Sequence, residues 1–180
     1  KIDSGDDAKK YFDLLSNSGY KCKVIIYPGF NKRYSCQHFY NDMAAVSSGK
    51  LIWTMPEDSE IIHGDWYKHL IKTRDCFKDN IYYVSIPMDN GKGSKQIIGA
   101  PAVSREWYNV QHQLSCMPNN DRWLHEIAKE TKRRIILKEE ELLMHFPVGR
   151  RVLSKQERKD VFYPAVKKTT KVFLKKIKDY

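Results

Sequence analysis

The chain contains 180 residues, of which 41% are hydrophobic and 30% are charged, and its formal net charge is +10. This apolar content excludes an intrinsically disordered protein, and the length suffices to bury a core within one domain. No run of about 18 apolar residues occurs, which excludes a membrane-spanning helix in this sequence. The sequence begins with Lys1 rather than Met, which indicates an excised domain or a processed product.

Helical and strand patterns alternate through the first part of the chain. Ser4 and Asp7 form a capping box, which predicts a helix to about Asn17 with an apolar face. Alternating apolar residues predict a strand over 20–27. We then expect, in chain order, a short helix over 37–46, a strand over 51–54, and a helix over 65–77 that Asp65 caps.

The alternation continues to residue 137. A strand over 81–88 and a return strand over 96–98 flank the segment 89–95, whose glycines and asparagine predict a hairpin turn. The spacing of this segment differs from that of a phosphate-binding P-loop. The remaining predicted elements are helices capped by Ser104 and Asn120 that end near Cys116 and Lys132, a strand over 134–137, a helix over 138–146, and a final helical segment introduced by the capping box Ser154–Glu157 and by Pro164.

This order of elements favours an α/β (or α+β) fold. We expect a mixed sheet of about five strands with helices on both faces. Residues 1–149 are predicted to form the core domain. Residues 150–180 are predicted to form a basic helical segment that is packed on this domain or appended to it.

The positive charge is concentrated at the C-terminal end. Residues 150–180 contain eleven Lys or Arg and three acidic residues, whereas residues 1–149 are close to neutral. Clustered positive charge attracts polyanions, and nucleic acid is the commonest polyanion in a cell. On the final helix, lysines recur every three or four residues and form one row. Their like charges repel one another, so helix stability alone does not explain the row. The predicted nucleic-acid-binding residues are Arg150, Arg151, Lys155, Arg158, Lys159, Lys167, Lys171, Lys175 and Lys178.

These features predict an intracellular protein, cytoplasmic or nuclear, that binds DNA or RNA in replication, repair or RNA processing. A solvated face on a packed helix produces the same charge pattern without any ligand. A basic amphipathic helix also suits an acidic protein partner or an anionic membrane surface, so these alternatives stay open.

Adjacent aromatic residues recur along the chain. Neighbouring side chains diverge on both helices and strands, so some of these rings are expected at the surface. Exposed rings beside cations suit stacking on unpaired bases, whereas the alternative is that they close the edge of the core. The pairs are Tyr11-Phe12, Phe39-Tyr40, Trp66-Tyr67, Tyr82-Tyr83, Trp107-Tyr108 and Phe162-Tyr163.

The densest group of metal-ligand residues is His63, Asp65 and His69. On a helix, Asp65 and His69 share one face and are able to reach the same divalent metal ion. A metal-dependent nuclease, or another enzyme acting on nucleic acid, is therefore the alternative function. The simpler interpretation is that Asp65 only caps a helix and the histidines are half exposed.

The cysteines Cys22, Cys36, Cys76 and Cys116 are too widely spaced for a zinc knuckle. We expect four free thiols, in keeping with an intracellular protein. Cys22, Cys76 and Cys116 are predicted to lie in the core, while Cys36 lies at a helix start that favours its thiolate.

Overall fold

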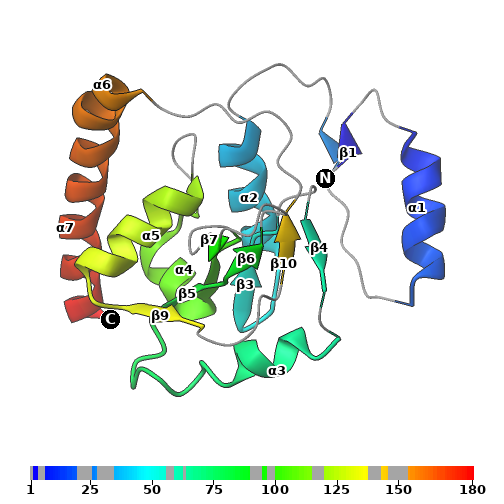
Figure 1. Ribbon diagram of the computed structural model, residues 1–180, viewed down its shortest axis with the longest axis horizontal. Helices are drawn as coiled ribbons and strands as arrows, with labels where there is room; N and C mark the ends of the chain where they lie inside the picture. The colour runs from blue at the N-terminus through cyan, green and yellow to red at the C-terminus, as the bar shows by residue number, and fades with distance from the viewer. Residues whose placement is uncertain are drawn as a thin grey trace.

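The computed structural model of the chain describes residues 2–3, 7–19, 26–27, 35–55, 59–62, 64–89, 95–96, 100–114, 120–137, 143–145 and 154–180. Within these segments, helices surround a mixed β-sheet, and a long helix forms the C-terminal end (Figure 1). The expected combination of helices with a mixed sheet is confirmed, with four strands rather than about five in the main sheet.

The main sheet has the strand order β3-β8-β5-β9. The inner strand β8 is antiparallel to both neighbours, and its Val103 pairs with Ile52 on one side and Tyr83 on the other. β9 lies parallel to β5 at the edge. The bounds are Leu51–Trp53 for β3, Ala102–Ser104 for β8, Tyr83–Ser85 for β5 and Arg134–Ile136 for β9.

A second four-stranded sheet has the order β4-β10-β6-β7. Antiparallel pairing of β6 with β7 confirms the predicted hairpin, although its turn lies outside the described residues. A parallel pair, β1 with β2, completes the sheets of the described segments. The bounds are Ile2–Asp3 for β1, Ile26–Tyr27 for β2, Ser59–Ile61 for β4, Met88–Asp89 for β6, Lys95–Gln96 for β7 and Leu143–His145 for β10.

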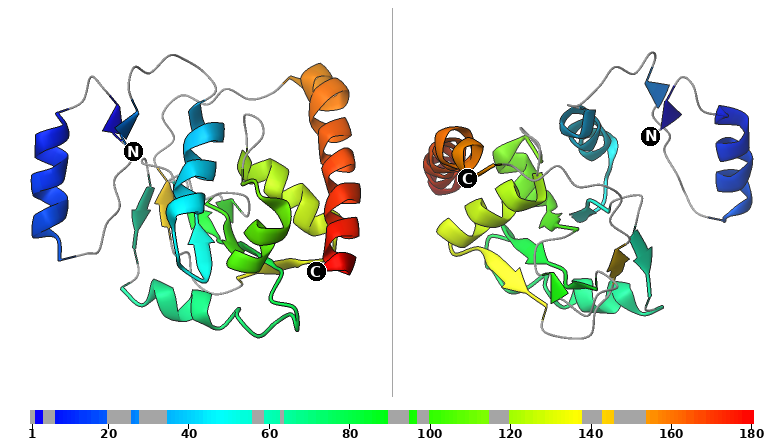
Figure 2. Two further views of the ribbon diagram at one scale, coloured as in Figure 1. Left: turned by 180° about the vertical axis from the view of Figure 1, so that it is seen from behind. Right: turned by 45° about the horizontal axis from the view of Figure 1, so that its top comes forward.

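Helices cover both faces of the main sheet, as expected. Side chains alternate along residues 81–84, which lead into β5. Ile81 and Tyr83 therefore enter one apolar cluster, called the first core, while Tyr82 and Val84 enter the second core. Helices α2, α4, α5 and α7 pack on the first face, and α3 packs on the second (Figures 1 and 2). The bounds are Ser35–Val46 for α2, Trp66–Ile71 for α3, Arg105–Gln111 for α4, Asn120–Glu130 for α5 and Tyr163–Asp179 for α7.

The predicted first helix is present as α1 (Ala8–Asn17). Its cap is Asp7, whose carboxylate accepts a hydrogen bond from the Lys10 N–H at 3.1 Å, whereas the sequence predicted Ser4 as the cap. No residue of α1 is buried. Figure 1 shows this helix at the opposite end of the molecule from α7.

The C-terminal helix continues from α6 (Lys155–Glu157) through a π-helical turn (Arg158–Phe162) into α7. Pro164 explains the wide turn, because it has no N–H to donate to the Asp160 carbonyl and its ring crowds that carbonyl. The Tyr163 N–H bonds instead to the carbonyl five residues earlier.

Several sequence predictions require correction. The strand predicted over 81–88 is divided between β5 of the main sheet and β6 of the second sheet. The helix capped by Ser104 ends at Gln111 rather than near Cys116. The helix predicted over 138–146 is wrong at residues 143–145. They form strand β10, which pairs with β4 on one side and β6 on the other. This pairing overrides the helical preference of Leu and Met. Helix α3 ends at Ile71 rather than near Phe77, and Cys76 is consequently exposed instead of buried. Strand β8 is not predicted at all, because its three residues are too few to show an alternating pattern.

Candidate nucleic-acid interface

Helix α7 is held against the protein by an apolar stripe at helical spacing. Val166, Thr170 and Phe173 are buried, and the rings of Phe173 and Trp107 of α4 lie 4.3 Å apart. Leu174 was expected in this stripe, but it is 41% exposed. It lies about 100° around the helix from Phe173, so only one of the two neighbours is able to face the core.

The opposite side of α7 carries a row of exposed lysines, Lys167, Lys171, Lys175 and Lys178, called the lysine row below. Successive members lie about 5–6 Å apart along the helix axis. Within the described segments, no acidic side chain forms an ion pair with any of them. The row therefore presents uncompensated ammonium groups to solvent.

The two other lysines of α7, Lys176 and Lys168, differ in their surroundings. Lys176 donates a 3.0 Å hydrogen bond to the Val110 carbonyl near the end of α4, where a cation also interacts favourably with the helix dipole. Lys168 is exposed three residues before Lys171 and seven before Lys175, so it adds positive charge to the same side of the helix. The contact of Lys176 gives it a structural role that the sequence alone does not reveal.

The basic residues at the start of the terminal helix lie among acidic ones. The Glu157 carboxylate accepts the Ser154 N–H at 2.8 Å and completes the predicted capping box, and Asp160 accepts a hydrogen bond from Gln156. Lys155 and Lys159 are exposed, whereas Arg158 is half-buried. Arg150 and Arg151 lie outside the described residues. Among the described residues of the basic end, the uncompensated positive charge is therefore greatest on α7 itself.

The aromatic pairs divide between core and surface. Tyr82 and Tyr83 are both buried, which excludes them from stacking on a ligand. Trp107 is buried and forms part of the core. In the pair Phe162-Tyr163, Phe162 is buried while Tyr163 is 47% exposed at the first residue of α7. Tyr163 therefore lies one helical turn before Lys167, on the same side of the helix.

The structure describes two of the three predicted metal ligands, Asp65 and His69. The Asp65 carboxylate forms an exposed ion pair with Lys68 at 2.8 Å and makes no side-chain cap of α3. His69 is half-buried on α3, and His63 lies outside the described residues. In the parts of the chain that the structure describes, no group of three or more His, Cys, Asp or Glu is arranged to hold a metal ion.

The predictions for the cysteines are open to comparison at Cys36 and Cys76. Cys36 is the second residue of α2, which confirms its predicted place at a helix start. Cys76 is a free thiol, as expected, although it is exposed. Cys22 and Cys116 lie outside the described residues, so their predicted burial stays a prediction.

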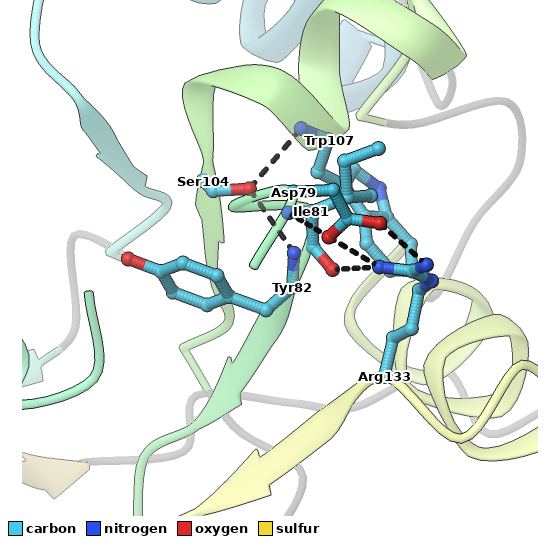
Figure 3. A network of polar contacts seen from close by, with 6 residues as sticks. All are labelled: Asp79, Ile81, Tyr82, Ser104, Trp107 and Arg133. Atoms are coloured by element: carbon cyan, nitrogen blue, oxygen red, sulfur yellow. Dashed lines mark hydrogen bonds and ion pairs between the residues drawn. The ribbon is translucent and has the colours of Figure 1, made fainter. Parts of the chain in front are cut away.

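Arg133 is partly buried and its guanidinium forms several hydrogen bonds within the protein (Figure 3). Its guanidinium donates to both Asp79 carboxylate oxygens at 2.8 and 2.7 Å, and to the Ile81 carbonyl at 2.8 Å. The hydrogen bonds from Arg133 lower the pKa of the Asp79 carboxyl below its ordinary value. Arg133 thereby joins the start of β9 to the segment that leads into β5.

Two further polar groups hold the first core together. The Ser104 hydroxyl accepts the N–H groups of Tyr82 and Trp107 at 3.2 and 3.1 Å, so it ties β5 to the start of α4 (Figure 3). His125 of α5 is buried, and its Nε2 lies 2.8 Å from the Arg134 guanidinium, which makes this nitrogen the acceptor. Burial, followed by the positive charge of Arg134, lowers the pKa of His125 to about 4.

No protein-family model, curated protein or solved structure matches this chain. Among the described residues, no helix is long and apolar enough to cross a membrane. Function is therefore inferred from the geometry of α7 and its surroundings.

Proposed function

We propose that the chain is a nucleic-acid-binding domain of an intracellular protein, and that the lysine row of α7 is its main contact surface. The observation that carries this proposal is the separation of the two sides of α7. One side is buried in the core through Val166 and Phe173, and the other presents four lysines with no acidic partner in the described segments.

The geometry supports contact with a phosphate backbone. Packing of α7 on α4 and α5 holds the helix axis in place, so the ammonium groups form a linear array rather than a flexible tail (Figure 2). Each lysine that contacts a phosphate releases a counterion, and the gain in entropy favours binding. Such contacts are independent of sequence, so we propose general affinity for DNA or RNA, in replication, repair or RNA processing.

The triple variant Lys167→Gln, Lys171→Gln and Lys175→Gln tests the proposal. We expect weaker binding to all nucleic-acid sequences, because the variant no longer neutralises the same phosphates. For each lysine–phosphate contact that is removed, the slope of log affinity against log salt should flatten by about 0.9 on duplex DNA and about 0.7 on single strands. Fluorescence anisotropy over a salt series, with labelled DNA and RNA, measures both quantities.

A matched control has the same change in net charge at exposed lysines elsewhere: Lys10→Gln, Lys50→Gln and Lys78→Gln. This control should retain the affinity and most of the salt slope. Equal losses in the two variants would show that net charge alone acts, and unchanged affinity in the α7 variant would refute the proposal. Competition by poly-glutamate as strong as that by DNA would instead support an acidic protein partner.

The metal-dependent nuclease stays a prediction, because His63 lies outside the described residues. The ion pair of Asp65 with Lys68 gives this alternative no additional support. Incubation of the binding samples with Mg²⁺, Mn²⁺ or Zn²⁺ tests it in the same experiment, and cleavage that His69→Ala abolishes would favour it.

A further inference from the structure

An exposed aromatic ring, that of Tyr163, lies one helical turn before the lysine row. Tyr163 is four residues before Lys167, so the i, i+4 ladder of α7 reads tyrosine, then Lys167, Lys171 and Lys175. Nearly half of the Tyr163 side chain is exposed, although it lies at the junction with the packed π-helical turn. A planar ring and three ammonium groups thus follow one another along about 18 Å of α7, each about 40° around the helix from the one before.

The position of Tyr163 is supported from the core side. Phe162 is only 1% exposed, and its ring contacts that of Tyr163 edge-on, with centroids 5.5 Å apart. The Arg122 guanidinium of α5 lies 5.9 Å from the Phe162 ring centroid. The buried ring therefore anchors the backbone beside Tyr163, so less conformational freedom is lost when a ligand stacks on the tyrosine.

A base stacks on a side chain only when its flat face is free. In a duplex, each face is covered by the next base pair, whereas single strands expose their bases to aromatic rings. From this geometry we infer that α7 selects single-stranded nucleic acid, with an unpaired base on Tyr163 and the following phosphates on the lysine row. This inference rests on the proposed function and names the substrate class of the same surface.

Replacement of Tyr163 by Ala, with Tyr163→Phe beside it, tests the inference. The probes are labelled oligo(dT) and a mixed-sequence duplex of equal length. Tyr163→Ala should lower the affinity for oligo(dT) by about 5- to 150-fold, the range for loss of one stacked base, and leave duplex affinity within about twofold. Tyr163→Phe should retain most of the single-strand affinity, because it keeps the ring.

The salt dependence distinguishes stacking from charge. Tyr163→Ala should leave the salt slope on oligo(dT) unchanged, since no counterion is released at a tyrosine, whereas Lys171→Gln should flatten it by about 0.7. Tyr67→Ala is the matched control, because Tyr67 is 45% exposed and lies near Lys68, but on α3, which covers the other face of the sheet. This control should bind both probes like the unmodified protein.

The outcomes distinguish a failure of strand selection from a failure of the proposed function. If Tyr163→Ala binds oligo(dT) normally, or weakens both probes equally, while the lysine variants lose affinity, strand selection is wrong and the nucleic-acid interface stands. If the lysine variants also bind both probes normally, the interface and the inference fail together.

Discussion

At the residue scale, the fold changes the acid–base chemistry of His125. The ring is 5% exposed, and three cations, Arg134, Lys129 and Arg122, add to the effect of burial. All of these influences disfavour the imidazolium, so the native protein keeps the ring neutral well below its ordinary pKa of about 6.5. His125 consequently links the stability of the first core to pH.

This linkage predicts a loss of stability in mild acid. The pKa of His125 is about 4 in the folded state. The unfolded chain therefore binds the additional proton between about pH 6.5 and pH 4, and the free energy of unfolding falls across this range. We expect a loss of about 2 kcal/mol from pH 7.5 to pH 5 in urea unfolding. His125→Gln should show a flatter profile, and an equally steep one would contradict the assignment to His125.

At the scale of single elements, the start of a helix depends on where its cap lies in the fold. The Ser104 hydroxyl is buried and accepts two backbone N–H groups, whereas the Asp65 carboxylate is exposed and makes no cap hydrogen bond. Both residues have the sequence signature of a cap. Only the tertiary contact of Ser104 with β5 gives its hydroxyl a second role.

The two caps should therefore differ in their effect on stability. Ser104→Ala leaves two buried N–H groups without their acceptor, so we expect a loss of about 1–3 kcal/mol. Asp65→Ala removes only an exposed ion pair with Lys68 and should change stability by less than about 0.5 kcal/mol. Chemical denaturation of both variants measures the difference. A comparable loss in Asp65→Ala would show that this carboxylate does cap α3.

At the scale of the whole molecule, α7 serves the core and the proposed interface together. Phe162, Val166 and Phe173 belong to the same apolar cluster as the side chains of α4, α5 and the sheet. Deletion of residues 164–180 would therefore remove part of the core as well as the lysines. Substitutions at the exposed lysines are the cleaner test of binding.

Two neighbours on α7 allow this packing to be measured. Phe173→Ala should lower the free energy of unfolding by about 3–5 kcal/mol, because it leaves a cavity beside Trp107. Leu174→Ala should cost less than about 1 kcal/mol, because this side chain is 41% exposed. Similar small losses in both variants would show that the helix is only loosely appended to the core.

The sequence alone determined the features that depend on local spacing and local charge. The cap Ser104, the strands β3 and β9 and the exposed lysine row follow from patterns within one turn or one strand. Only the tertiary structure decided the pairing of β10, the burial of both Tyr82 and Tyr83, and the structural contact of Lys176. These outcomes depend on residues distant in the chain, and short segments contain no information about which partner will cover them. For the same reason, the exposure of Tyr163 beside Lys167 is evident only from the structure, in which Phe162 is buried in the core and Tyr163 lies at the surface.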